Sequence, residues 1–397
     1  MNIAFFCDAY KPTRNGVAVS AATTANELRA RGHRVVIFAP RYTGHEDHDE
    51  EIFRFPAGHW FRAKDFPVTW PALSWPVIES LHFSARRRFA REDFDVVHAH
   101  SPFTIGTLGA YWARRAHIPL VFTFHTLYHH YLHYAPLPRW FSRFYTLWRV
   151  RHYCRLCDHI IAPSQPVARL VRRFRPGAPC TVLATGIQVE RFSGGDRNGV
   201  RTRYGIAADE IVLLYAGRLV LEKNLIFLLC TLAPLLARCS GQKVRLMLVG
   251  GGPALSSLQA LARELNIAEQ VIFTDFVDWA TIPEYYAAGD IFVFASRTET
   301  QGVSIAEALA AGLPCVVVGA MGAAESIDHG DNGFIVPPRE AEFRTAVARL
   351  IEDCSLRRAM SDSARRSAPA LSLQSRVDSL LGIYQSLNPS RMLSLAT

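Results

Sequence analysis

The chain carries, from Ile291 to Pro314, the stretch IFVFASRTETQGVSIAEALAAGLP. Its first five residues are apolar, which predicts a buried strand, and its Ala- and Leu-rich second half predicts a helix. Glu299 therefore lies in the turn after the strand, and Glu307 lies about one turn inside the helix. Two interpretations are open. Either the pair belongs to a ligand site beside a helix N-terminus, or Glu299 caps the helix while Glu307 lies on its solvated surface.

The same alternation of apolar runs and helical patterns extends outward along the chain in both directions. It predicts an α/β protein of two domains, residues 1–190 and 191–370, each a doubly wound parallel sheet. A Gly-rich polar segment, residues 193–199, is the predicted linker. Because ligands of such folds bind outside the carboxyl ends of the strands, we expect a cleft between the domains to hold the site. The predicted strands begin at Ile3, Val35, Asp95, Leu120 and His159 in the first domain and at Ile211, Val244, Val271, Ile291 and Cys315 in the second.

Three predicted turns at strand ends carry groups that suit a phosphorylated ligand. Arg218 and Lys223 flank the turn after the strand that ends at Tyr215. Two fixed cations beside a helix N-terminus suit a pyrophosphate, although a solvated basic pair is the alternative. Gly250–Gly252 follow another strand and allow close approach of a backbone, which a tight turn alone would also explain. Gly16, before the first helix, allows a backbone N–H to approach a phosphate or a sugar.

The excess of basic residues lies entirely in the N-terminal half. Residues 1–190 hold 24 Lys and Arg against 14 Asp and Glu, whereas residues 191–397 hold 20 against 21. This balance is typical of a domain that faces an anionic partner, or else the charges are merely solvated. No apolar run free of charge is long enough to cross a membrane, and Met1 begins a strand pattern rather than a signal peptide. We therefore expect the cytoplasm as the compartment.

Aromatic residues lie beside arginines in helical patterns of this basic half. Such a composition suits the interface of an anionic membrane, and it also suits single-stranded nucleic acid. A third interpretation is that the aromatic face packs into the core while the arginines are solvated. No nucleic-acid-binding motif accompanies the pattern, so the membrane ranks above RNA or DNA. The candidate membrane or acceptor residues are Trp140, Phe144 and Trp148 on one helical face, Arg143 on the other, and the run Arg86, Arg87 and Arg88.

Several groups of histidines, cysteines and acidic residues suggest metal sites, but their spacing favours other roles. The histidines have no HExxH motif and no nearby acidic residue. Cys154 and Cys157 form a CxxC without a second pair, which indicates a structural role. Asp47-His48-Asp49 has a DxD form but lies in an acidic loop that we expect to be solvated. The histidines concerned are His98, His100, His125, His129, His130 and His133.

Together these motifs resemble the retaining glycosyltransferases of the large family 4, which have the GT-B fold. The resemblance covers nearly the whole chain. It implies two Rossmann-like domains that face a central cleft, with a C-terminal helix over residues 371–397 that completes the first domain. It rests on Gly217-Arg218 with Lys223-Asn224, on Gly250 to Pro253, and on the Glu299/Glu307 pair. The N-terminal half resembles more narrowly the bacterial 1,2-diacylglycerol 3-alpha-glucosyltransferases, through Phe5 to Pro12, Asn15-Gly16-Val17, His98 to Phe103 and Phe124 to Tyr128.

The resemblance also implies roles for individual residues. Arg218 and Lys223 would bind the donor pyrophosphate and stabilise the leaving nucleoside diphosphate. Glu307 would hold the ribose hydroxyls, and Glu299 would face the transferred sugar. His125 would contact that sugar from the N-terminal domain. The backbone would complete the donor site around Gly16, Gly217, Gly251, Gly302 and Val303.

From this resemblance we expect a retaining hexosyltransferase attached to the inner face of a membrane. It would move glucose from UDP-glucose to diacylglycerol, with no metal and no cofactor, because the nucleotide sugar is a co-substrate. Its partners would be that donor, an anionic membrane surface and the lipid, but no nucleic acid. One alternative is a GDP-mannose-dependent mannosyltransferase that acts on phosphatidylinositol or a soluble glycan. An alternative of another class is a scaffold that binds nucleotide sugars without turnover.

Overall fold

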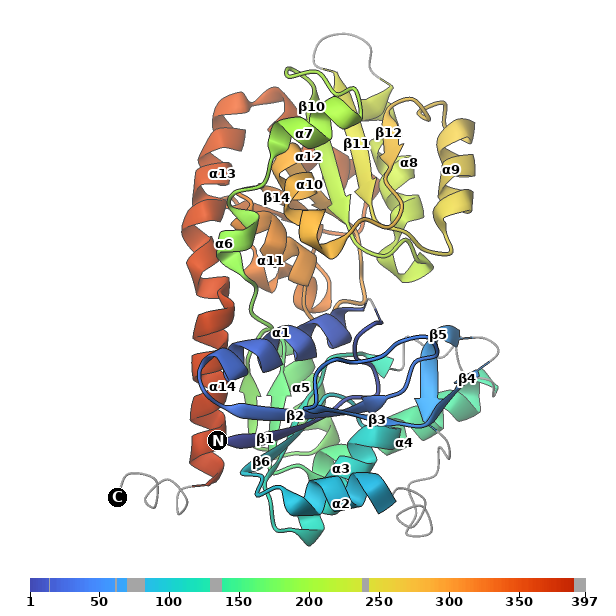
Figure 1. Cartoon of the computed structure of the whole chain (residues 1–397). Coiled ribbons are helices and arrows are strands. Elements are labelled where there is room, and N and C mark those ends of the chain that lie inside the picture. The colour runs from blue at the N-terminus through green and yellow to red at the C-terminus, as the bar shows by residue number, and fades with distance from the viewer. Residues whose placement is uncertain (14, 61–62, 70–82, 129–137, 238–242, 389–397) are drawn as a thin grey trace. The chain divides into compact units, whose positions relative to one another are not determined.

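The computed structural model describes residues 1–13, 15–60, 63–69, 83–128, 138–237 and 243–388 (Figure 1). The chain divides into two compact units. The first comprises residues 1–186 together with the segment from Leu373 onward, and the second comprises residues 187–372. The division therefore lies after Gly186 and after Ser372, whereas the sequence placed it near residues 190 and 370.

The first unit is built on a seven-stranded sheet in which every neighbouring pair of strands is parallel. The order is β3-β2-β1-β6-β7-β8-β9. The chain therefore starts in the middle of the sheet, winds outward through β2 and β3, and then returns to the other side of β1. The strands are β1 (Asn2–Phe6), β2 (Arg34–Pro40), β3 (Ile52–Phe55), β6 (Val96–Ala99), β7 (Leu120–Thr123), β8 (His159–Ala162) and β9 (Cys180–Val182); a separate antiparallel hairpin joins β4 (Ala57–Trp60) to β5 (Ala63–Thr69).

Helices connect these strands, and the last helix of the chain packs against the first. The helix α14 contacts α1 and contributes Leu373, Val377, Leu380 and Tyr384 to the core beside β1 and β2. The first unit is therefore completed by a segment that lies more than 180 residues beyond the rest of it in the sequence. Its helices are α1 (Gly16–Ala30), α2 (Phe83–Arg91), α3 (Thr104–Arg115), α4 (Arg139–Leu156), α5 (Gln165–Phe174) and α14 (Leu373–Leu387).

The second unit repeats the plan with a six-stranded parallel sheet of order β12-β11-β10-β13-β14-β15. Its strands are β10 (Ile211–Ala216), β11 (Val244–Val249), β12 (Val271–Phe273), β13 (Ile291–Phe294), β14 (Cys315–Val318) and β15 (Gly333–Val336). Its helices are α6 (Val189–Phe192), α7 (Arg197–Arg203), α8 (Leu225–Leu236), α9 (Leu255–Glu264), α10 (Ile282–Ala288), α11 (Val303–Ala310), α12 (Glu340–Glu352) and α13 (Cys354–Ser367), with 3-10 turns η4 (Leu221–Lys223), η5 (Trp279–Thr281), η6 (Met321–Ser326) and η7 (Ala368–Leu371).

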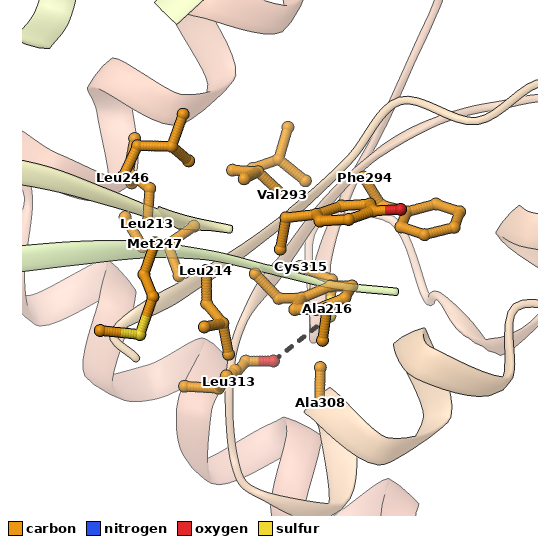
Figure 2. Packing of buried hydrophobic residues seen from close by; sticks show 14 of the residues in the cluster. Leu213, Leu214, Ala216, Leu246, Met247, Val293, Phe294, Ala308, Leu313 and Cys315 are labelled. Carbon is orange, nitrogen blue, oxygen red and sulfur yellow. Dashed lines mark hydrogen bonds between the residues drawn. The ribbon is translucent and has the colours of Figure 1, made fainter. Parts of the chain in front are cut away.

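The strand–turn–helix unit around β13 shows why these sequences fold in this way. The strand β13 is buried on both faces, as in a central parallel strand, and packs with Leu214 and Cys315 in the core of the unit (Figure 2). The helix α11 ends at Ala310, and Gly312, just beyond its C-cap Ala311, has a φ of 78°, a backbone conformation that favours glycine. At the other end of the chain, the Asn15 side chain caps α1 by accepting a hydrogen bond from Ala18 N at 2.8 Å.

The structure confirms the predicted fold class of two parallel-sheet Rossmann-like domains. It adds β3, β9, β15 and the β4–β5 hairpin, which the sequence reading did not predict. These three sheet strands are short and lie at sheet edges, and the side chains of β3 and β9 are only partly buried for the most part. A short mixed pattern carries little periodicity, so only pairing with a neighbour identifies it as a strand.

Candidate functional site

Lys223 and Glu299 form an ion pair in the second unit, with Nζ 2.5 Å from Oε1. Lys223 ends the 3-10 turn after β10, and Glu299 lies in the loop after β13, so two neighbouring parallel strands deliver the pair. The same carboxylate oxygen accepts a hydrogen bond from Ser296 Oγ at 2.8 Å. Glu299 is thus held by residues from two loops and does not cap α11, because the N-cap residue Gly302 offers no side chain.

Arg218 lies five residues before Lys223 in the same loop and is half-buried. The Tyr215 hydroxyl donates to Arg218 O at 3.0 Å and so ties the backbone of the loop to the end of β10. In the part of the chain that the structure describes, the Arg218 guanidinium has no hydrogen bond or ion pair. A half-buried cation without a protein partner is available to an anionic ligand.

The glycines at the ends of β10 and β11 let these two loops approach each other closely. Gly250 has a φ of 126°, and a Cβ placed on it would lie 2.2 Å from Gly217 O. A Cβ on Gly251 would lie 2.3 Å from an oxygen of Asp275. Leu219 N also donates to Gly251 O at 3.0 Å. Close packing against backbone explains Gly250, and close side chains of Asp275 and Phe276 explain Gly251. A role of Gly217 or Gly251 toward a ligand stays a prediction.

The N-terminus of α11 offers backbone donors that no side chain caps. Its N-cap Gly302 is buried, and the first turn, which begins at Val303, holds no acidic residue. The loop before it is anchored by Gly322 N, which donates to Glu299 O at 3.0 Å. An uncapped helix N-terminus of this kind attracts anionic oxygens through its free N–H groups and its dipole.

Glu307 is buried, with an exposed fraction of 8%, so the interpretation of a solvated helix surface is wrong. Its Oε2 accepts a hydrogen bond from the Tyr286 hydroxyl at 2.6 Å. Burial raises the pKa of Glu307 to about 7, while the Tyr286 hydrogen bond and the charge of Arg191 act in the opposite direction. A carboxyl poised in this way is typical of functional sites.

Tyr286 and Arg191 are two residues near Glu307 that the sequence did not indicate. Tyr286 lies on α10, where an apolar helical pattern predicts only core packing. Arg191 lies in the short helix α6, with its guanidinium 4.3 Å from the centre of the Trp279 ring and a hydrogen bond to Trp279 O. No local motif identifies either residue, because α6, α10 and α11 meet only in the folded unit.

In the first unit, His125 lies at the carboxyl end of β7 and His100 lies at that of β6. The Nε2 atom of His125 is 2.9 Å from Nδ1 of His100, and their rings stack at 5.2 Å. Burial lowers the pKa of His125 to about 4 and the pKa of His98 to about 3. His98 is fixed between Tyr384 of α14, at 2.6 Å, and Thr123, at 2.7 Å. These histidines are therefore neutral hydrogen-bonding groups at neutral pH.

Gly16, the other candidate of the first unit, opens α1 next to the Asn15 cap. A Cβ placed on Gly16 would meet no atom within 4 Å, so the protein itself does not require a glycine there. The structure leaves its backbone open to approach. A role in donor binding stays a prediction.

Within the described ranges, no three His, Cys, Asp or Glu side chains gather closely enough to hold a metal ion. Asp47 and Asp49 of the DxD segment instead pair with Arg54 at 2.7 Å and Arg29 at 2.6 Å. Cys154 and Cys157 are buried free thiols, and burial raises the pKa of both. Three of the histidines considered as metal candidates, His129, His130 and His133, lie outside the described residues.

The aromatic face of α4 is exposed, so the interpretation that it packs into the core is wrong. The exposed fractions are 74% for Trp140, 68% for Phe144 and 53% for Trp148. Arg143 on the same helix is also exposed. Three large exposed rings on one helix make this face a candidate docking surface.

The arginines of α2 are placed less uniformly. Arg86 and Arg87 are exposed, and Arg87 lies over the exposed Phe83 ring at 5.4 Å. Arg88 instead pairs with Glu51 at 3.1 Å, so it is partly committed to holding α2 against the loop before β3. Among the described residues, no helix combines the length and the apolar character that a membrane crossing requires.

Comparison with known families shows two matches that together cover most of the chain. Residues 14–191 match the family "Glycosyltransferase Family 4", and residues 196–367 match "Glycosyl transferases group 1". The two matches meet close to the division between the two units. Each unit thus corresponds to one of the two halves recognised in such enzymes.

Individual relatives agree with these matches. The alpha-monoglucosyldiacylglycerol synthase of Streptococcus pneumoniae is 32% identical over 329 residues, which cover 80% of this chain and 71% of that protein. A GDP-mannose-dependent alpha-mannosyltransferase of Mycobacterium tuberculosis is 30% identical over 395 residues, which cover 98% of each. Among solved structures, sucrose-phosphate synthase of Thermosynechococcus elongatus matches with a TM-score of 0.79 and 19% identity over 100% of both chains, which shows the same fold.

Proposed function

This chain belongs to the family 4 glycosyltransferases of GT-B fold, and from that premise we propose that it transfers a hexose from a nucleotide sugar to a membrane lipid. We propose diacylglycerol as the acceptor and UDP-glucose as the donor. The name of the Streptococcus relative supports glucose as the sugar and diacylglycerol as the acceptor. The observation that carries the lipid acceptor is the exposure of Trp140, Phe144 and Trp148 on α4.

The donor would bind at the carboxyl ends of β10, β11 and β13 in the second unit. Arg218, which has no partner in the described chain, and Lys223 would neutralise the pyrophosphate, helped by the uncapped N-terminus of α11. Glu307 would accept hydrogen bonds from the ribose hydroxyls. Glu299, held by Lys223 and Ser296, would face the sugar. In the first unit, His125 would contact the same sugar as a neutral hydrogen-bonding group.

The reaction breaks the bond between the anomeric carbon and the phosphate oxygen, and charge builds up on the leaving diphosphate. Arg218 and Lys223 would stabilise that charge directly, so the proposal includes no metal and no other cofactor. We propose retention of the anomeric configuration. The acceptor oxygen would attack from the face that the leaving group vacates, and a donor phosphate oxygen would take its proton. The protein would then contribute position and electrostatic stabilisation.

The acceptor would be presented by a membrane surface that α4 and α2 contact. The rings of α4 would enter the interface between lipid headgroups and acyl chains, while Arg143, Arg86 and Arg87 would pair with anionic headgroups. The first unit would thereby serve the acceptor and the second unit the donor. The enzyme would be a peripheral protein of the inner membrane face.

A second candidate is a GDP-mannose-dependent mannosyltransferase, because the Mycobacterium relative matches the chain over its whole length. Its acceptor would be phosphatidylinositol or a soluble glycan. A scaffold that binds nucleotide sugars without turnover is less well supported, since the paired Lys223 and Glu299 and the buried Glu307 are all present.

The proposal is tested by offering radiolabelled UDP-glucose and GDP-mannose separately to the full chain. Each donor is supplied with vesicles that contain either diacylglycerol or phosphatidylinositol. Transfer of label from UDP-glucose to diacylglycerol is the expected result, and nuclear magnetic resonance of the product then reports the anomeric configuration. Transfer only from GDP-mannose would support the second candidate. If neither donor labels a lipid, the lipid acceptor is wrong.

A further inference from the structure

One of the two carboxylate oxygens of Glu307 has a hydrogen-bond partner on a neighbouring helix. The Tyr286 hydroxyl of α10 lies 2.6 Å from Oε2. The described residues supply no hydrogen-bond partner for the other oxygen, Oε1. A buried carboxylate needs several hydrogen-bond donors to stay ionised, and here the described residues provide one donor, which binds Oε2.

The Tyr286 ring is fixed, so the direction of its hydroxyl is fixed as well. Tyr286 has an exposed fraction of 1%. Its ring packs edge-on against Phe192 at 5.3 Å and is stacked on Phe292 at 5.9 Å. A tyrosine clamped on two sides cannot swing away from its acceptor without opening the core of the unit.

The single hydroxyl proton of Tyr286 has two possible acceptors, Glu307 Oε2 at 2.6 Å and Ser304 O at 3.3 Å. The shorter bond goes to the ionisable group, and hydrogen bonds to an ionised acceptor are the stronger ones. The Tyr286 hydroxyl therefore donates its hydrogen bond to Oε2 of Glu307. This leaves Oε1 as the oxygen that can accept from a ligand.

The other charged group that acts on Glu307 is Arg191 of α6. Cys315 of β14 and Tyr215 of β10 are the other ionisable groups that act on Tyr286, and burial raises the pKa of both, which keeps them protonated. The Arg191 guanidinium is bound to Trp279, as described above, and acts on Glu307 through its charge. Tyr286 is thus the group that holds the carboxylate directly.

We propose that Tyr286 is a positioning residue for the donor: its hydroxyl keeps the Glu307 carboxylate oriented and ionised so that Oε1 accepts a hydrogen bond from a ribose hydroxyl of the nucleotide. This inference rests on the proposed role of Glu307 in the donor site. Tyr286 does not itself touch the donor. Its contribution should therefore disappear whenever the ribose hydroxyl or the negative charge of Glu307 is absent.

The test compares Tyr286→Phe with two other variants in the full chain. Phenylalanine keeps the ring packing and removes only the hydroxyl. Tyr285→Phe is the matched control, since Tyr285 is equally buried on the same helix but directs its hydroxyl toward Arg203 at 3.3 Å. Glu307→Gln removes the negative charge. Binding of UDP-glucose and GDP-mannose is measured by calorimetry, and the donor that binds is used further.

At about pH 7, Tyr286→Phe should weaken donor binding about tenfold, the scale of a lost hydrogen bond to a charged group. Turnover at saturating donor should change less than about twofold, because the contact is equal in the ground and transition states. Tyr285→Phe should bind as the wild type does. Wild-type affinity for Tyr286→Phe would overturn the inference.

The 2′-deoxyribose form of the same donor shows whether Tyr286 acts through the ribose contact. The wild type should prefer the ribose donor about tenfold, and Tyr286→Phe should lose most of that preference. The effects of Tyr286→Phe and of the missing ribose hydroxyl on the binding free energy are then non-additive. A Tyr286→Phe variant that binds both donors more weakly by the same factor would have a structural defect only, and the inference would be wrong.

The pH dependence separates the two proposals. The pKa of Glu307 is about 7, and loss of the Tyr286 hydrogen bond should raise it further, so the binding defect should be large at about pH 6.5 and shrink toward about pH 8.5. An intact nucleotide sugar has no phosphate that titrates in this range. A defect independent of pH would overturn the inference. If instead Glu307→Gln keeps the affinity and the ribose preference, the proposed donor site itself is wrong.

Discussion

Glu307 is a carboxyl group that the second unit buries at a cost in stability. Its pKa is raised from 4.5 to about 7, so the unfolded chain gives up this proton at a lower pH than the folded unit does. Above about pH 4.5 the folded state therefore loses stability as the pH rises, until both states are ionised above pH 7. A carboxyl group that is retained at such a cost fits the proposed role of Glu307 toward the donor ribose.

Glu307→Gln should therefore stabilise the second unit while it weakens donor binding. We expect the free energy of unfolding at pH 8 to rise by on the order of 2 kcal/mol, with little change near pH 4.5. Urea denaturation at the two pH values measures this difference. Equal or lower stability at pH 8 would show that burial does not penalise the Glu307 carboxylate.

The two cations of the site differ in what they do for the fold. Arg218→Ala should lower kcat/KM by about a hundredfold, on the scale of a lost transition-state contact, without changing the melting temperature. Lys223→Ala should lower both kcat/KM and the melting temperature, because Glu299 would lose its partner at 2.5 Å. Arg339→Ala, which removes an exposed arginine of the same unit, is the control for net charge. Full activity of Arg218→Ala would remove it from the site.

At the scale of elements, α14 determines whether the first unit is complete. It buries Leu373, Val377, Leu380 and Tyr384 against β1, β2 and α1, and Tyr384 also fixes His98. Burial of four such side chains is worth on the order of 6 to 12 kcal/mol. That is comparable with the whole stability of an ordinary domain.

Deletion of residues 373–397 should therefore unfold the first unit and leave the second unit folded, because the second unit has its own core. Hydrogen exchange followed by mass spectrometry reads the two units separately. Deletion of residues 389–397 keeps α14 whole and serves as the control. A protected first unit after the longer deletion would contradict this prediction.

In the proposed function, membrane attachment depends on the helix α4. Replacing Trp140, Phe144 and Trp148 by alanine should weaken binding to anionic vesicles at least about tenfold, because their rings would no longer enter the interface. The melting temperature should hold, since these rings are exposed. Wild-type binding should also fall with added salt. Phe276→Ala, another exposed ring, is the control, and unchanged vesicle binding of the α4 variant would exclude this surface.

At the scale of the whole molecule, the two units carry buried ionisable groups of opposite character. In the first unit, the pKa values of His98, His100 and His125 are all lowered by burial. The unfolded chain therefore binds more protons than the folded unit below about pH 6.5, and stability is lost as the pH falls. In the second unit, the raised pKa of Glu307 has the opposite effect, so this unit loses stability as the pH rises.

Acidification from about pH 7.5 to 5.5 should consequently destabilise the first unit more than the second. Hydrogen exchange in β6 and β7 should become faster relative to exchange in α10 and α11, because the histidines lie on or beside the first pair of strands. The same experiment in a Glu307→Gln variant should reduce the change in α11 only. An equal response of both units would contradict the assignment.

Local patterns were sufficient to predict the central strands and the fold class. Runs such as 291–295 are continuously apolar because a parallel strand is buried on both faces, and Gly312 ends the next helix for a reason that is local to the backbone. The edge strands β3 and β9 were missed because their burial is partial, and β15 was missed because its four residues are too few to show a periodicity. The partners of Glu307 were missed because Tyr286 and Arg191 come from other helices.

Local sequence patterns predicted two parallel α/β domains, which the structure confirms, and they singled out Arg218, Lys223, Glu299 and Glu307 as candidate site residues. Such predictions are possible because periodicity, turn residues and short motifs are properties of neighbouring positions. Three features became visible only in the folded chain: Lys223 pairs with Glu299, Glu307 is buried and hydrogen-bonded to Tyr286, and the rings of α4 are exposed. Burial and charge pairing depend on which elements pack together, across 76 residues for the ion pair, and no local pattern contains that information.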